Sequence, residues 1–362
     1  MTRLESKRQY GIAILLMLFL HLFRSSDPNL YYSVLNAVFH RNVLSILTRF
    51  AGICVACYAF ITGYGFAEQA ARKFKQEKTD IVQILKYIAA HIIKLYKKYW
   101  FVFLIFVPLG YLNGSYQDFS VKSLILSLLG LDSTYNGAWW YVWQYVILCA
   151  VFPLELVLFD LLNKLFKKKN YLSIKNILLL TAIGGGLTAA FWVLDGFKLQ
   201  KAVYGIICML GYLSSEYGII TKGRNRLKKL PHTGLFCCGF LILLIALRIV
   251  LQSLWGGING PVDIIVIIPY FIVICELTDR CRFTWRVFDL FGKHSTYMWL
   301  IHNFFLVTNL VVVIRITSIA ALKYLILVAV SLACSWVFLW IEDRLLPPKR
   351  LKRNAAWTTQ VR

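Results

Sequence analysis

Two histidines lie within apolar stretches of the chain, where a titratable side chain is costly and is therefore a candidate for chemistry. His21 ends the apolar run that begins at Gly11, and His302 follows the run after Lys293. At ~1.5 Å of rise per residue, each lies roughly 14–16 Å along its helix, near the middle of a bilayer. A neutral imidazole can take a proton from a hydroxyl and return it, so His21 is a candidate general base that His302 would orient. Histidines satisfied by a neighbouring helix are an equal alternative.

Three lysines at the start of the third apolar stretch are candidate ligands for a phosphorylated substrate. Lys94 and Lys97 are three residues apart and are expected to share a helix face, and Lys98 follows them. Ammonium groups hold phosphates as point charges. The simpler interpretation is that these lysines are ordinary positive anchors at the membrane surface.

An aromatic run before the fourth apolar stretch is a candidate binding surface for a sugar. Its members are Trp139, Trp140 and Tyr141. Aromatic faces can stack on sugar rings, but tryptophan and tyrosine also populate membrane interfaces for structural reasons. Neither role is favoured by the sequence alone.

Ten apolar stretches must position these residues. A hydrocarbon core ~30 Å thick requires about 20 apolar residues in a helix. The sequence predicts spans at 10–23, 46–66, 92–112, 140–162, 174–194, 201–219, 234–254, 261–278, 296–314 and 320–341. Of the 40 Lys and Arg residues, 31 fall in the two ends and in alternate gaps between these spans. This bias predicts an all-α, polytopic transmembrane bundle with both termini in the cytoplasm.

The composition agrees with a membrane protein and excludes several other classes. Hydrophobic residues make up 59% of the chain, and the mean hydropathy is +0.64. The net charge of +23 is explained by the cytoplasmic loops, which favour anionic lipid as a partner rather than nucleic acid. We expect one membrane domain over 1–346, a basic cytoplasmic tail over 347–362, and no cleavable signal peptide. The nine cysteines mostly lie in spans and predict neither a disulfide framework nor a metal site.

The chain resembles the acyltransferase-3 family of bacterial integral-membrane acyltransferases, which commonly O-acetylate cell-surface carbohydrates. Four segments carry the resemblance, and they occur in the family's order. They are the first span ending in a histidine (Gly11 to His21), a Phe-x-x-Ser-Gly-Tyr-like pattern (Phe60 to Phe66), a Trp-Phe…Pro-Leu-like segment (Trp139 to Tyr141, then Pro153-Leu154), and a Gly-Lys-x-Ser…Leu-x-His-like segment (Gly292 to Ser295, then Leu300 to His302). The last segment is the most specific, and the resemblance covers nearly the whole chain.

Some positions depart from the family pattern. Tyr10 stands where the family often has Arg or Lys, and Thr62 stands where it usually has Ser. The family's Arg-x-x-Arg corresponds here to Lys94-x-x-Lys97, which keeps the charge but loses the bidentate fork of arginine.

The resemblance implies a membrane O-acetyltransferase. Its donor would be acetyl-CoA as a co-substrate, attracted by Lys94, Lys97 and Lys98, with no further cofactor. Its acceptor would be a hydroxyl of a cell-envelope or surface glycan, bound by the aromatic run. The protein would lie in the bacterial cytoplasmic membrane, with His21 as the base and direct transfer preferred to a covalent enzyme intermediate.

Two other classes remain possible on the sequence. A transporter or flippase for a glycan precursor would also place ionisable residues at mid-membrane depth, although no inverted repeat is visible. A membrane scaffold or sensor without chemistry would not need two histidines at that depth.

Overall fold

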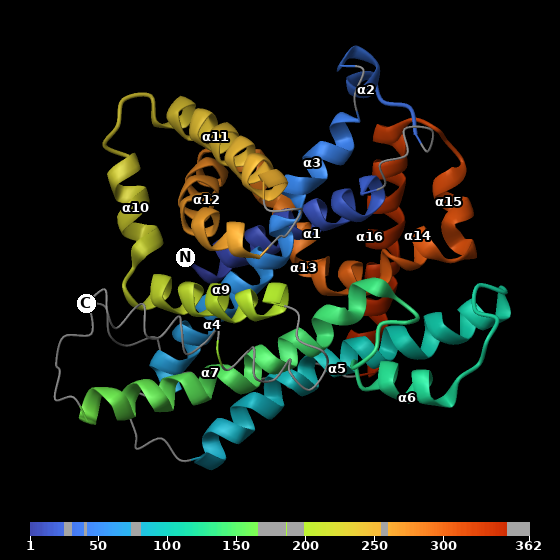
Figure 1. The fold of residues 1–362 in the computed structure, drawn as a ribbon, viewed down its shortest axis with the longest axis horizontal. Helices are drawn as coiled ribbons and strands as arrows, with labels where there is room; N and C mark the ends of the chain where they lie inside the picture. The colour runs from blue at the N-terminus through green and yellow to red at the C-terminus, as the bar shows by residue number, and fades with distance from the viewer. Residues whose placement is uncertain are drawn as a thin grey trace.

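A computed structural model describes residues 1–24, 31–39, 42–73, 81–165, 186, 199–254 and 260–345. Within these residues all regular elements are helices, and the β pairing is a single isolated bridge between Tyr32 and Ile319 (Figure 1). The all-α expectation is therefore confirmed. In chain order the helices are α1 (Arg3–Phe23), α2 (Val34–Phe39), α3 (Val43–Ala51), α4 (Ile53–Lys73), α5 (Ile81–Leu112), α6 (Val121–Leu128), η2 (Gly137–Trp139), α7 (Trp140–Leu165), α9 (Leu199–Glu216), α10 (Ile219–Leu227), α11 (Thr233–Leu254), α12 (Pro261–Arg280), α13 (Arg282–Ile301), α14 (Phe304–Val307), η3 (Asn309–Val311), α15 (Val312–Arg315) and α16 (Ala320–Leu345).

Several helices are suited to a membrane. In the described part of the chain, four segments are long and apolar enough to cross one: Val43–Glu68, Thr233–Leu254, Pro261–Arg280 and Ala320–Leu345. The pair formed by α9 and α10 also passes this test, but it bends by 68°. These segments fit a helical membrane protein. The expected span 174–194 and the expected basic tail 347–362 lie outside the described residues, apart from Gly186.

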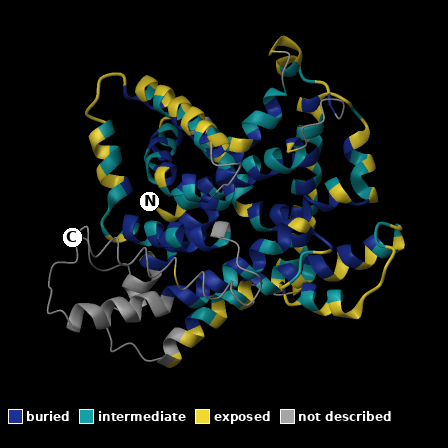
Figure 2. Ribbon diagram, in the orientation of Figure 1, coloured by how far each residue is buried: buried dark blue, intermediate teal, exposed yellow. Residues whose placement is uncertain are grey.

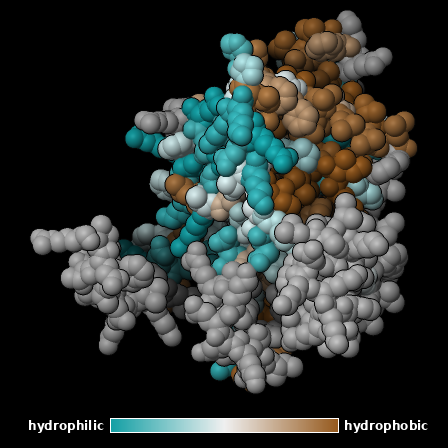
Figure 3. Space-filling view, turned by 90° about the vertical axis from the view of Figure 1, so that its left-hand side faces the viewer, coloured by the Kyte–Doolittle hydropathy of each residue, from teal (hydrophilic) through white to brown (hydrophobic). Residues whose placement is uncertain are grey.

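The surface is divided between polar and apolar areas. Buried residues gather where α1, α4, α9 and α13 meet, whereas the outward sides of α5, α6 and α11 are exposed (Figure 2). On α11 the exposed side chains include Leu235, Ile242 and Leu254. Viewed from the side of α10, a hydrophilic band lies next to a hydrophobic area (Figure 3). Exposed apolar helix faces beside a polar band are what a bilayer requires.

The expected span over 296–314 is wrong as a single helix. Helix α13 ends at Ile301, and α14, η3 and α15 follow as short pieces. At Thr308 the backbone is extended, and the side-chain hydroxyl accepts a hydrogen bond from the Leu310 N–H at 3.2 Å. This polar cap starts a new helical turn within an apolar run, which a hydropathy pattern does not detect. Because α13 ends at Ile301, His302 lies at the end of a helix rather than inside one.

Glycines allow two pairs of helices to touch backbone to backbone. A Cβ atom added to Gly11 would lie 2.3 Å from the Phe288 carbonyl oxygen, and one added to Gly292 would lie 1.9 Å from the Lys7 carbonyl oxygen. These contacts join α1 to α13. Between α4 and α9 the same role falls to Gly63 and Gly211, since a Cβ on either would collide with the backbone of the facing helix. Small residues at such crossings are the usual means of close helix packing in membranes.

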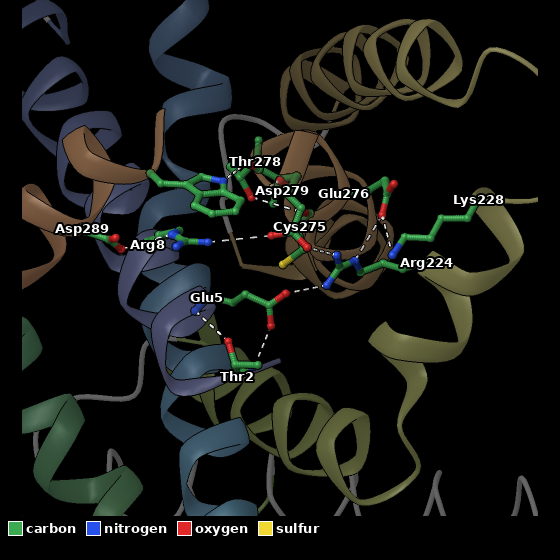
Figure 4. A network of polar contacts seen from close by, with 12 residues as sticks. Thr2, Glu5, Arg8, Arg224, Lys228, Cys275, Glu276, Thr278, Asp279 and Asp289 are labelled. Atoms are coloured by element: carbon green, nitrogen blue, oxygen red, sulfur yellow. Dashed lines mark hydrogen bonds and ion pairs between the residues drawn. The ribbon is translucent and has the colours of Figure 1, made fainter. Parts of the chain in front are cut away.

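A network of ion pairs holds α1, α10, α12 and α13 together near the N-terminus (Figure 4). Arg224 of α10 contacts Glu5 at 2.6 Å and Glu276 at 3.4 Å, and it also pairs with Asp279. Arg8 of α1 lies 3.2 Å from Asp289 of α13. The network fixes the beginning of α1 against three other helices.

Candidate active site

The packing of α1 on α13 brings the two histidines together. His21 lies ten residues after Gly11, and His302 lies ten residues after Gly292. Because the helices run in the same direction from their glycine contact, an equal rise of ~15 Å carries both histidines to the same level. The Nδ1 atom of His21 lies 2.6 Å from the Nε2 atom of His302. The sequence placed the two at similar depth, and the structure shows that they touch.

The hydrogen bonds of this pair assign the proton on each ring. The Nδ1 atom of His302 lies 2.8 Å from the Trp299 carbonyl oxygen and 3.1 Å from the Met298 carbonyl oxygen. A carbonyl oxygen only accepts, so this nitrogen carries the proton and donates. Nε2 of the neutral His302 ring then accepts from Nδ1–H of His21. It follows that Nε2 of His21 keeps its lone pair, as a general base requires.

His21 lines a small cavity, which we call the histidine chamber. Its volume is about 20 Å³, and its other lining residues include Cys54, Tyr58, Trp140 and Trp299. About 10–15 Å³ measured in this way holds one water molecule, so the chamber accommodates a group of one or two heavy atoms. His302 itself is fully buried behind His21.

A second and larger cavity adjoins the histidine chamber, and we call it the basic cavity. Its volume is about 300 Å³, and its lining includes Lys94 and Lys98. Tyr58, Tyr141 and Trp299 line both cavities and therefore form the partition between them. The lysine-lined cavity and the candidate base are thus separated by one layer of aromatic side chains.

Helical periodicity explains which residues line the basic cavity. On α5 they are His91, Lys94, Leu95 and Lys98, which follow the i, i+3, i+4, i+7 pattern of one helix face. On α4 the lining residues Tyr58, Ile61, Thr62 and Gly65 repeat the same spacing. Gly65 has open space where a Cβ would lie, so the absence of a side chain there enlarges the cavity.

The three predicted lysines are in different surroundings. Lys94 is exposed and lines the basic cavity, with no ion-pair partner among the described residues. Lys98 lines the same cavity, but its ammonium lies 2.9 Å from the Glu342 carboxylate and 4.3 Å from the centre of the Tyr297 ring. Lys97 lines a separate groove of about 360 Å³ instead of the basic cavity. The structure thus brings Lys94 and Lys98 to one cavity and leaves Lys97 outside it.

The aromatic run is also divided. Trp140 and Tyr141 line the histidine chamber. Trp139 is fully buried, and its indole N–H donates to the Leu300 carbonyl oxygen at 3.0 Å, a carbonyl that Asn136 also contacts. Trp139 therefore fixes the end of α13 next to His302.

Several cavity residues were not found from the sequence. Trp299 lies within the Gly-Lys-x-Ser…Leu-x-His-like segment, and Thr62 lies within the Phe-x-x-Ser-Gly-Tyr-like pattern. The family motifs could therefore have indicated both residues. No sequence motif indicated Tyr58, because an aromatic residue in an apolar helix is typical of any buried face. In the described part of the chain, no group of three His, Cys, Asp or Glu side chains is arranged to hold a metal ion.

Comparison with known families assigns the chain to a class of protein. The model of the acyltransferase-3 family, an acyltransferase domain, matches residues 11–340, which is nearly the whole chain. The chain belongs to the acyltransferase-3 family. It is accordingly a membrane acyltransferase, and the transporter and scaffold alternatives are not supported. No curated protein and no solved structure matches the chain.

Proposed function

We propose that this acyltransferase moves an acetyl group from acetyl-CoA to a hydroxyl of a cell-envelope or surface glycan. One observation carries the proposal. His21, whose Nε2 atom keeps its lone pair, lines the histidine chamber, and this chamber shares three lining residues with the lysine-lined basic cavity. This arrangement supports a base and a donor site that lie next to each other.

The basic cavity suits a coenzyme A thioester. Lys94 and Lys98 supply positive charge for phosphate groups, and the apolar wall suits the pantetheine arm. The histidine chamber, at about 20 Å³, favours an acetyl group over a longer acyl chain. Acetyl-CoA is a co-substrate in this proposal, and no other cofactor is invoked.

The proposed reaction is a direct transfer. Nε2 of His21 removes the proton from the acceptor hydroxyl as its oxygen attacks the thioester carbonyl carbon. His302 accepts the hydrogen bond from Nδ1–H and holds the ring in this orientation. When the C–S bond breaks, the proton on His21 passes to the departing thiolate, and both imidazoles return to the neutral state.

Trp140 and Tyr141 would contact the acceptor. Both line the chamber that contains His21, so they would border the acceptor hydroxyl at the point where the base removes its proton. Trp139 would act indirectly, by positioning the end of α13 through the Leu300 carbonyl.

The expected arrangement in the membrane supports the route of the donor. Ten spans with both termini in the cytoplasm, including a basic tail over 347–362, would place Lys94 at the cytoplasmic surface near anionic lipid. Single cysteines at Gln117 and Asn225, in a background without the nine native cysteines, test this. An impermeant thiol reagent outside intact cells should label the first and not the second, and the reverse pattern would overturn the orientation.

The decisive experiment is acetyl transfer from labelled acetyl-CoA by the purified protein in proteoliposomes that contain an envelope glycan extract. His21→Gln keeps polarity and much of the volume but removes the base, so the rate should fall by about 10²–10⁴. His302→Ala should reduce the rate less, because it loses orientation only. His232→Gln, on the exposed surface, is the matched control and should remain active. Near-normal turnover of His21→Gln would refute the base assignment, and mass spectrometry of the product would identify the acylated sugar.

A further inference from the structure

Two tyrosine hydroxyls lie in the partition between the cavities. The hydroxyls of Tyr58 and Tyr141 are buried and form no hydrogen bond of ordinary geometry. The rings lie 6.3 Å apart between centroids, one on α4 and one on α7. A buried hydroxyl without a partner costs free energy, so a group that accepts from it is strongly favoured at that point.

The surroundings of the two hydroxyls differ slightly. Ser295 is the polar side chain beside the Tyr58 hydroxyl, and its own hydroxyl donates to the Gly292 carbonyl oxygen at 3.2 Å. Tyr141 is packed between aromatic rings, with Trp299 at 5.8 Å and Tyr58 on the other side. Both side chains are more than nine-tenths buried. Tyr58 thus has one polar neighbour within the fold, whereas the neighbours named for Tyr141 are aromatic rings.

The position of the partition indicates what these hydroxyls would meet. Tyr58, Tyr141 and Trp299 line both cavities, so they lie between a donor in the basic cavity and the base. Since the chamber beside His21 holds one or two heavy atoms, the thioester carbonyl must lie at the wall itself when its carbon faces the attacking oxygen. That carbonyl oxygen would be an acceptor close to two phenolic donors.

We propose that the Tyr58 and Tyr141 hydroxyls form the oxyanion hole of the transfer reaction. The inference rests on the proposed acetyl transfer. As the acceptor oxygen bonds to the carbonyl carbon, the π electrons of the C=O bond move onto the carbonyl oxygen, and both phenolic O–H groups donate to this oxyanion. The C=O bond re-forms when the C–S bond breaks, and the tyrosines keep their protons throughout. Donors fixed before the charge develops stabilise it without reorganisation.

Removal of each hydroxyl should therefore reduce kcat rather than donor binding. In Tyr58→Phe and Tyr141→Phe, kcat should fall on the order of 10²-fold or more, with the KM for acetyl-CoA essentially unchanged. Tyr270→Phe is the matched control, because Tyr270 is equally buried but lies on α12 outside both cavities, and its kcat should be unchanged. A change in KM with normal kcat would show that the tyrosines only line the path and would overturn the proposal.

A second measurement does not depend on turnover. An unreactive acetyl-CoA analogue, in which a methylene group replaces the sulfur, retains the carbonyl. Isotope-edited infrared spectra should show its C=O stretch at lower frequency in the wild type than in Tyr58→Phe or Tyr141→Phe. Equal frequencies in the three proteins would overturn the oxyanion hole. If instead the wild type transfers no acetyl group, the proposed function fails, which is a separate result.

Discussion

Helices α1 and α13 meet at two polar clusters that differ in how completely their groups are paired. Near the beginning of α1, the guanidinium of Arg8 contacts Asp279 at 3.8 Å and Asp289 at 3.2 Å, and it lies 4.4 Å from the centre of the Trp285 ring. Farther along, His21 and His302 share one hydrogen bond, and one imidazole nitrogen remains open. The comparison indicates that paired charges hold the helices, whereas an incompletely paired cluster is available for a substrate.

The fully paired cluster has a clear energetic reason. Arg8 and Arg224 are nearly buried, with side chains 5% and 11% exposed, and Glu276 is 2% exposed. Charges removed from water are tolerated only when other groups compensate them. Both histidines can be neutral, so they can be buried without an opposite charge beside each of them. Helix α1 thus has one end fixed by ion pairs, and the proposed base lies at its other end.

The largest effect should come from the glycine contact that both clusters share. In Gly292→Ala the added Cβ would lie 1.9 Å from the Lys7 carbonyl oxygen, so α1 and α13 must separate. A shift of about 1 Å at the site costs on the order of 10² in rate, and overpacking lowers stability by about 1–3 kcal/mol. Activity in proteoliposomes and Tm in detergent measure these effects.

Gly239→Ala is the control for this substitution. Gly239 lies in α11 with open space where a Cβ would be, so the variant should match the wild type in both measurements. Equal activity of Gly292→Ala and Gly239→Ala would show that the close contact does not position the histidines.

The second effect concerns stability alone. In Arg224→Met, Glu5 and Asp279 lose their shared cation, and Glu276 keeps its contacts with Arg280 and Lys228. Breaking a buried ion pair costs about 3–5 kcal/mol, so Tm should fall markedly while the folded protein retains its kcat. Arg226→Met, on the exposed side of the same helix, should be neutral. A variant with normal Tm but low kcat would mean that the paired cluster also serves the reaction.

The sequence was most informative where hydropathy or helical rise alone determines the structure. The apolar run before His21 predicted α1, and the depth of the two histidines followed from helical rise. Whether their helices touch was not accessible, because Gly11 and Gly292 reveal a contact only once the partner helix is known. Hydropathy also missed the break between α14 and η3, since the cap at Thr308 lies within an apolar run.

The lysines show a second limit of sequence reasoning. Both i+3 and i+4 neighbours of Lys94 lie on its side of the helix, and spacing alone does not choose between Lys97 and Lys98. The choice depends on where α4 and α7 pack. The same applies to Trp139 and Trp140, which are adjacent in sequence but differ in whether they line the chamber.

A third prediction tests the division of the lysines. Lys94→Ala should raise the KM for acetyl-CoA about tenfold, equivalent to ~1.4 kcal/mol, because one phosphate contact is lost. Lys97→Ala removes an equal charge from the same helix but outside the basic cavity, so its KM should stay near the wild-type value. Equal changes in both variants would indicate general attraction by the positive surface rather than a defined donor site.

The smallest effect should be the pH dependence contributed by Glu5. Burial raises the pKa of this carboxyl, but the hydrogen bond from the Thr2 backbone and the contacts with Arg224 outweigh it, so its pKa lies below the ordinary 4.5. A group whose pKa is lowered by folding stabilises the native state above its unfolded-state pKa. That stability is lost as the pH falls through the folded-state pKa. Between pH 7 and pH 4, Tm of the wild type should therefore decrease more than that of Glu5→Gln, whose side chain does not titrate. Parallel curves for the two proteins would show that Glu5 gains nothing from Arg224, and that the paired cluster depends on its other carboxylates.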